Sequence, residues 1–287
     1  MFLLENKILT LLFLEGLLIS YDKYSLYLHG GKEMKETLAE VCITAETKIT
    51  MMNQRPVNYF LQAVLGGLFI GFGILLIVTI GGLFDPAGEP SMKVVQGLSF
   101  GVALSMVMMA GANLFTGDNL VLSISTLSKK TTPLEMIGIW TFSYIGNFCG
   151  SLLSAGLFFY AGLAVGDTAN YVEKIATVKM NGGFVALLCR GILCNLLVCL
   201  AVWCAYKLKT EIAKLAMIFC CIFPFITSGF EHSIANMTLF CLALFIPHGE
   251  MVSLAGAIAN LVPVTIGNII GGAIIGIIYW INGRERR

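Results

Sequence analysis

Charged side chains are scarce in this sequence. They make up 12% of its 287 residues, whereas about 25% is usual for soluble domains, and hydrophobic side chains reach 57% against about 45–50%. A chain this apolar is not a soluble domain, so the bilayer must be its solvent. The formal net charge of only +1 also predicts no nucleic-acid partner.

Long runs without Asp, Glu, Lys or Arg separate the polar segments. Four of these runs exceed the roughly 20 residues that cross a hydrocarbon core about 30 Å thick. Two other runs, 191–206 and 215–230, are too short to cross this core without further residues at one end. The sequence therefore predicts an all-α integral membrane protein with no separate catalytic domain. The six expected spans are 58–84, 94–127, 134–165, 184–206, 215–246 and 252–282.

The distribution of Lys and Arg sets the expected orientation. Twelve of them lie at residues 32–55, after the second span, after the fourth span and in the C-terminal tail. Only Lys93, Lys174 and Lys179 lie in the segments on the other side. Because positively charged loops stay inside, we expect a multi-pass protein of the cytoplasmic membrane with both termini in the cytoplasm.

The second and fifth spans are interrupted by glycine and polar residues, at 111–118 and 227–233. Irregular backbone at membrane depth is tolerated only where it is buried in protein or lines a cavity. Broken helices therefore point to a pathway through the protein.

The third and sixth spans share the pattern I-G-N-x-x-G, which begins at Ile145 and at Ile266. The chain thus divides into two halves of three spans, 58–165 and 184–282. An odd number of spans per half inverts the second half, so the two breaks are expected to meet near the midplane. Paired interruptions in inverted repeats indicate a binding or conduction site.

His232 is the only histidine within a predicted span, and Glu231 precedes it. Ionisable groups at that depth are costly and usually functional, and imidazole changes its charge near neutral pH. The alternative for His232 is a structural histidine that donates to a neighbouring carbonyl. For Glu231 we favour a structural carboxylate, which satisfies local backbone or tunes its neighbour, over a direct substrate contact.

Nine cysteines raise the question of a metal site. Cys189, Cys194, Cys199 and Cys204 are spaced by five residues, which scatters their sulfurs around a helix. No second membrane histidine accompanies them, and no Walker, Rossmann or nucleophile-elbow pattern is present. We therefore expect no metal, no cofactor and no enzymatic activity, with reduced and buried cysteines.

Several motifs resemble those of the formate/nitrite transporter family. The longest is S-G-F-E-H-S-I-A-N-M at 228–237, and others are L-F-T at 114–116, G-I-L-C-N at 191–195, A-V-W at 201–203 and P-V-T-I-G-N-I-I-G-G at 263–272. They occur in the family's order over about residues 35–283. The resemblance implies an aquaporin-like protomer with six transmembrane helices, a homopentamer, and one pore through each protomer.

The resemblance also implies site residues. The family's central histidine falls on His232, its loop threonine on Thr116, the asparagine of its fourth span on Asn195, and the lysine near its outer mouth on Lys179. Its apolar constrictions fall on Phe100, Leu104, Leu114 and Phe225. Phe100 and Leu104 are four residues apart and so share a helix face.

These residues suggest a mechanism for formate, nitrite or hydrosulfide. Lys179 draws the anion in, and His232 protonates it wholly or partly with Thr116 and Asn195 as hydrogen-bond partners. The neutral acid then crosses the apolar constriction, which a bare charge cannot cheaply do. The rival interpretation is an aquaporin-like pore for neutral small solutes.

Two charged residues have no family role that we can assign. Arg190 either snorkels to the outer interface or adds positive potential at the mouth. Asp118 either caps the second half of the broken helix or disfavours anions near the loop.

Residues 1–33 form an uncertain extension, because Glu5, Lys7 and Glu15 interrupt their apolar run and no small-residue cleavage site follows. Residues 34–57 are more polar and are expected to contain an amphipathic helix along the cytoplasmic face. We expect Met34 to be the natural start. Intact mass of the protein expressed from its native locus checks this, and a mass that includes residues 1–33 would contradict it.

Overall fold

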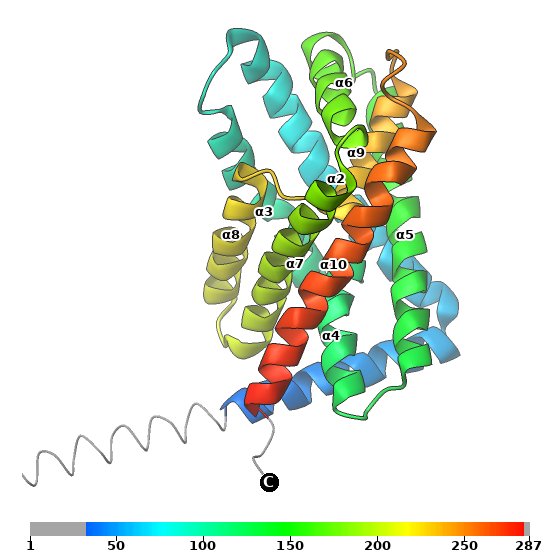
Figure 1. Ribbon diagram of the computed structural model, residues 1–287. Helices are drawn as coiled ribbons and strands as arrows, with labels where there is room; N and C mark the ends of the chain where they lie inside the picture. Colours follow the sequence, from blue (N-terminus) through cyan, green and yellow to red (C-terminus); the bar gives the residue numbers. More distant parts are fainter. Residues whose placement is uncertain (1–32, 284–287) are drawn as a thin grey trace, which may run out of the picture.

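A computed structural model describes residues 33–283, and all regular secondary structure within that range is helical (Figure 1). The first described segment is a helix over residues 33–54, which we call the N-terminal helix. It is followed by α2 (Pro56–Phe84), η1 (Asp85–Ala87), α3 (Met92–Ala110), α4 (Phe115–Leu127), α5 (Pro133–Tyr160), α6 (Gly166–Met180), α7 (Phe184–Lys207), α8 (Glu211–Thr227), α9 (Ser233–Phe245) and α10 (Leu254–Gly283).

Five of the described helices are long and apolar enough to cross a membrane. They are α2, α3, α5, α7 and α10, and α2 is the most apolar of them. α9 is apolar but has only 13 residues, and α8 has 17. The boundaries of α2, α5, α7 and α10 lie close to those expected from the charge-free runs.

Helices stop in both segments where the sequence predicts interruptions. α3 ends at Ala110 and is followed by Gly111, and α8 ends at Thr227, two residues before Gly229; these glycines have φ of 76° and 75°. Residues other than glycine are strained in this left-handed conformation, so glycine ends each helix at little cost in free energy. Extended segments lead from the glycines to α4 and to α9, which begin at Phe115 and Ser233.

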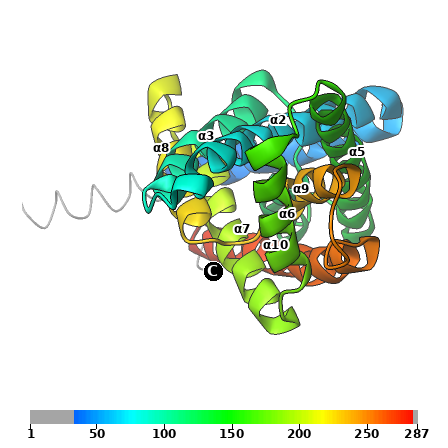
Figure 2. The ribbon, with the colours of Figure 1, turned by 90° about the horizontal axis from the view of Figure 1, so that it is seen from above.

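Two helices lie across opposite ends of the bundle (Figure 1). The N-terminal helix buries Val41, Ala45 and Ile49 at one end, where the last residue of α10, Gly283, packs beside Leu38. At the other end α6 lies over the centre of the bundle (Figure 2). α6 was not predicted from the sequence, because its mixed composition resembles a polar connection. We call these two ends the N-terminal face and the α6 face.

Close helix contacts depend on glycine at a few positions. Gly67 of α2 lies directly against the backbone of Asn147 in α5, and a Cβ there would overlap the Asn147 carbonyl. Because the obstacle is backbone rather than a flexible side chain, α2 and α5 would have to separate. Small residues let helix backbones approach in this way.

Replacing Gly67 with Ala is therefore expected to destabilise the fold by about 1–3 kcal/mol, the usual cost of overpacking. A matched control is Gly138→Ala in α5, where the nearest group to an added Cβ is a Met52 methyl at 3.6 Å. Thermal unfolding in detergent, followed by size-exclusion chromatography, should show a lower midpoint for G67A only. Equal midpoints for both variants would contradict the assigned packing.

Candidate functional site

Two cavities lie at opposite ends of the bundle. The one beneath the N-terminal helix has a volume of about 270 Å³, and we call it the N-terminal cavity. The one beneath α6 has a volume of about 180 Å³, and we call it the α6 cavity. The first is lined by residues that include Lys48, Gln62, Leu104, Leu114 and Asp118, and the second by residues that include Lys93, Gln96, Tyr171, Lys179, Phe225 and His232.

Apolar side chains separate the two cavities. Leu104 and Leu114 line the N-terminal cavity, and Phe225 lines the α6 cavity. Phe100 meets Phe225 edge to face, with ring centroids 5.7 Å apart. All four side chains are buried. Of the four positions that the resemblance assigned to constrictions, Leu104 and Leu114 thus border one cavity, Phe225 borders the other, and Phe100 packs on Phe225.

His232 borders this apolar stretch. It is the N-cap of α9, and its Nδ1 accepts a hydrogen bond from the backbone N–H of Ala235 at 3.2 Å. Its Nε2 lies 3.0 Å from Thr116 Oγ1, which comes from the first turn of α4. The two broken helices therefore meet through these two side chains. The imidazole ring also lies over Phe225, with centroids 6.1 Å apart.

The cap contact fixes the tautomer of a neutral His232. Because Nδ1 accepts from Ala235, the ring proton is assigned to Nε2, which donates to Thr116 Oγ1. The Thr116 hydroxyl keeps its own proton for another acceptor. A doubly protonated ring would point Nδ1–H at the Ala235 N–H, so it has to break the cap.

Asn195 lies beneath this pair and does not reach His232. Its Nδ2 contacts the backbone carbonyl of Thr116 at 3.2 Å, Asn119 Oδ1 at 3.0 Å and the Asn268 carbonyl at 2.6 Å. Its side chain is fully buried and lines neither cavity. Asn195 therefore holds the backbone of Thr116 in place.

Two asparagines hold the breaks themselves. Asn147 Oδ1 accepts from the N–H of Phe115, and its Nδ2 donates to the carbonyls of Ala63 and Asn113. Asn268 makes the same set of bonds with different partners. Its Oδ1 accepts from Ser233 N–H, and its Nδ2 donates to the carbonyls of Gly191 and Glu231. These asparagines are the third residues of the two I-G-N motifs.

On the α6 face, Lys179 is bound to an acid. Its Nζ lies 2.7 Å from Glu231 Oε1, and Glu231 Oε2 accepts from Asn236 Nδ2 at 2.6 Å. Glu231 and Asn236 are buried, and Asn236 also donates to Asn260. The lysine expected to attract anions is thus largely neutralised by its partner.

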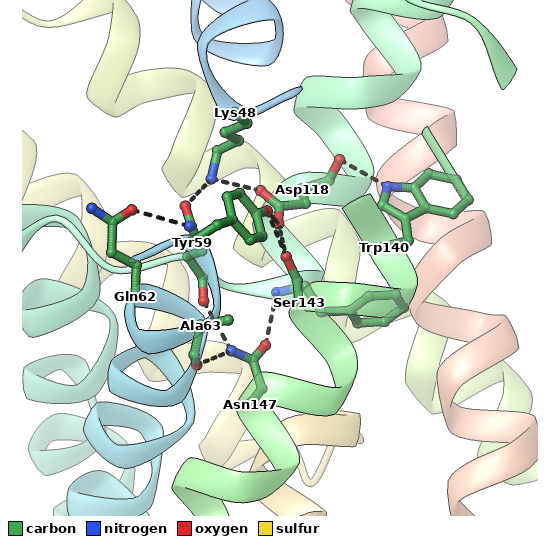
Figure 3. A network of polar contacts seen from close by, with 10 residues as sticks. Lys48, Tyr59, Gln62, Ala63, Asp118, Trp140, Ser143 and Asn147 are labelled. Carbon is green, nitrogen blue, oxygen red and sulfur yellow. Dashed lines mark hydrogen bonds and ion pairs between the residues drawn. The ribbon is translucent and has the colours of Figure 1, made fainter. Parts of the chain in front are cut away.

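A corresponding group lies on the N-terminal face (Figure 3). Lys48 of the N-terminal helix reaches Asp118 Oδ1 at 3.0 Å and also donates to Asn113. Asp118 Oδ2 accepts from Ser143 Oγ at 2.7 Å, and Ser143 is 2.8 Å from Tyr59 Oη. Each face therefore has a lysine, an acid and an asparagine beside a helix break.

The acid and the amide exchange places between the two groups. On the N-terminal face the amide, Asn113, precedes the half-helix and the acid, Asp118, lies within it. On the α6 face the acid, Glu231, precedes the half-helix and the amide, Asn236, lies within it. Lys48 and Asn113 were not among the site residues expected from the sequence. With α6 in view, its Lys179 would have indicated an equivalent lysine on the N-terminal helix, but α6 was not expected.

The structure decides between the roles left open for Asp118 and describes the place of Arg190. The N-cap of α4 is Leu114, with no side-chain cap, so the capping role expected for Asp118 is wrong. Its carboxylate instead bonds Lys48 and Ser143. Arg190 is exposed on α7 and does not line the α6 cavity.

Comparisons with known proteins agree on one family. The profile of the formate/nitrite transporter family matches residues 35–281. The nitrite transporter NirC of Escherichia coli strain K12 is 38% identical over 249 residues, which cover 85% of this chain and 91% of that protein. The formate channel BtFdhC of Bacillus thuringiensis is 34% identical over 247 residues, 85% of this chain and 93% of that protein.

Solved structures have the same fold. An FNT family ion channel superposes with a TM-score of 0.81 at 34% identity, covering 86% of this chain and 98% of that one. A pentameric formate channel with formate bound gives a TM-score of 0.68 at 27% identity, covering 78% and 96%. The chain is a multi-pass membrane protein and belongs to the formate/nitrite transporter family.

Proposed function

We propose that this protein is a channel or transporter for small monovalent anions of weak acids, namely formate, nitrite or hydrosulfide, with proton coupling at His232. The observation that carries the proposal is the contact between His232 and Thr116 at the apolar stretch between two cavities. The printed names of its relatives, nitrite transporter and formate channel, support the substrate class.

The proposed architecture is two inverted repeats of three membrane crossings. In the first, α3 and α4 share one crossing, and in the second α8 and α9 share one. The matching bonds of Asn147 and Asn268 support this arrangement. The helix over 33–54 and α6 are then equivalent lead helices, since Lys48 and Lys179 take equivalent places beside the breaks.

In the membrane, we propose a homopentamer with one pore in each protomer, in line with the solved pentameric formate channel. The excess of Lys and Arg on the N-terminal face favours the cytoplasm for that face and for both termini. The α6 face is then the outer side of the cytoplasmic membrane.

The apolar stretch is the reason for proton coupling. An unpaired anion between Phe100, Phe225 and Leu104 would lose its hydration without gaining a partner, which costs many kcal/mol. An anion that takes up one proton becomes a neutral acid and can cross. It returns the proton on the other side, so one anion and one proton move together.

His232 and Thr116 are the groups proposed to assist this step. The neutral ring donates Nε2–H to Thr116 Oγ1, which leaves the Thr116 hydroxyl proton free to hydrogen-bond the anion. The proton that neutralises the anion comes from water on the more acidic side, and the acid releases it to water on the other side, so the ring keeps its own proton throughout. Asn195 supports Thr116, and Glu231 keeps Lys179 in place.

Replacing His232 with Asn tests the proton step. Asn is also a good N-cap residue, so α9 should keep its start while the imidazole is lost. We expect purified H232N in proteoliposomes to lose the acceleration of formate or nitrite uptake by an acidic exterior. The uptake rate should fall about 10- to 100-fold, as expected for a lost hydrogen bond to a charged group worth about 1.5–3 kcal/mol.

The matched control is His248→Asn, because His248 is exposed in the α9–α10 connection and contacts only Gly249 in its hydrogen bond. H248N should behave as the wild type. Unchanged proton coupling in H232N would refute the role of His232. Passage of small neutral solutes by the wild type, with no anion uptake, would favour the aquaporin-like alternative.

A further inference from the structure

One face of α3 runs from the α6 cavity to the N-terminal cavity, along the proposed pathway. Lys93, Gln96, Phe100 and Leu104 are separated by three, four and four residues, the spacing of a single helix stripe. Lys93 and Gln96 line the α6 cavity, Phe100 packs on Phe225, and Leu104 lines the N-terminal cavity. The stripe thus begins with a cation at the mouth and becomes apolar at the constriction.

Lys93 differs from the other cations near the α6 face. Lys179 is bound to Glu231, and Lys174 is bound to both oxygens of Asp85 at 2.7 and 2.9 Å. Arg190 lies outside the cavity lining. Lys93 is exposed and lines the cavity, and within residues 33–283 its ammonium has no ion pair. Of the two lysines that line this cavity, Lys179 has an acidic partner and Lys93 has none within residues 33–283.

The surroundings of the mouth are otherwise acidic. Five acids lie in the α2–α3 connection, in α6 and in the α9–α10 connection: Asp85, Glu89, Asp167, Glu173 and Glu250. They repel an approaching anion, and only Asp85 has a lysine partner in the described chain. The ammonium of Lys93 therefore attracts anions to the mouth of the α6 cavity, within surroundings that otherwise repel them.

A buried hydroxyl lies deeper in the same cavity. Gln96 Nε2 donates to Tyr171 Oη at 2.9 Å and to the carbonyl of Ile77 at 2.8 Å. Within the described residues the Tyr171 hydroxyl proton has only Gln96 Oε1 as acceptor, at an O···O distance of 3.3 Å, which is long beside the usual 2.7–2.8 Å. Burial raises the pKa of Tyr171 above its usual value, so the hydroxyl stays protonated and can donate.

We propose that Lys93 captures the anion at the mouth of the α6 cavity and that the Tyr171 hydroxyl is its first hydrogen-bond donor inside. The ligand class is a monovalent anion small enough for a cavity of about 180 Å³, such as formate or nitrite. This inference rests on the proposed function, and it transfers the attracting role that the resemblance gave to Lys179 to a different lysine.

Lys93→Gln and Lys174→Gln remove the same charge from the same face, but only Lys93 lines the cavity. Formate uptake is measured in right-side-out membrane vesicles, normalised to protein amount, at about 10 mM and about 500 mM ionic strength. At low salt, K93Q should need about three- to tenfold more formate for half-maximal uptake, with an unchanged maximal rate, as for the loss of one charge. The difference should nearly vanish at high salt because screening then acts within about 3–5 Å.

K174Q should have the same half-saturating formate concentration as the wild type. Lys93→Arg should also keep the wild-type value, because only the positive charge is required. Tyr171→Phe should raise the half-saturating concentration at both ionic strengths, since a hydrogen bond is short-ranged. Equal behaviour of K93Q and K174Q, or a K93Q deficit that high salt leaves unchanged, would overturn the assignment of Lys93. An unaltered half-saturation in Y171F would overturn that of Tyr171. A wild type that takes up no anion would instead overturn the proposed function, and this inference with it.

Discussion

The site depends on two buried asparagines that replace the backbone bonds lost where helices break. Asn147 and Asn268 each accept one N–H at the start of a half-helix and donate to two carbonyls. Without them these polar groups would be unpaired in an apolar interior, at about 1–3 kcal/mol each. Because the breaks are held, Thr116 and His232 face each other at a fixed distance. Glycine supplies the space that this arrangement needs, since Gly67 lets the α2 backbone touch Asn147.

Much of this was predictable because the bilayer imposes simple rules. Charge-free runs located α2, α5, α7 and α10 within a few residues, and the glycine and polar residues at 111–118 and 227–233 marked the breaks. The repeated I-G-N motif marked the two asparagines that make matching hydrogen bonds. His232 stood out as a titratable group at membrane depth, although its bond to Thr116 required the fold.

Other features could not be read from the sequence because they depend on partners far apart in the chain. The ion pair between Lys179 and Glu231 joins residues that are 52 apart in the sequence. The sequence also left open whether Asp118 caps α4 or disfavours anions near the loop, and the N-cap of α4 is Leu114. α6 was missed because its polar residues suggested a loop, whereas Tyr171 and Val172 are buried against the bundle. The side-chain amide of Asn195 could bind a substrate, but its Nδ2 contacts two backbone carbonyls and Asn119 Oδ1 instead.

The exchange of acid and amide between the two faces has a consequence for the direction of movement. The negative charge of Glu231 lies in the extended segment before its half-helix, whereas that of Asp118 lies inside its half-helix. An anion that approaches from the α6 face therefore meets these charges in a different order from one that approaches from the N-terminal face. Equal concentration gradients in opposite directions then need not give equal fluxes, even when each anion moves together with a proton.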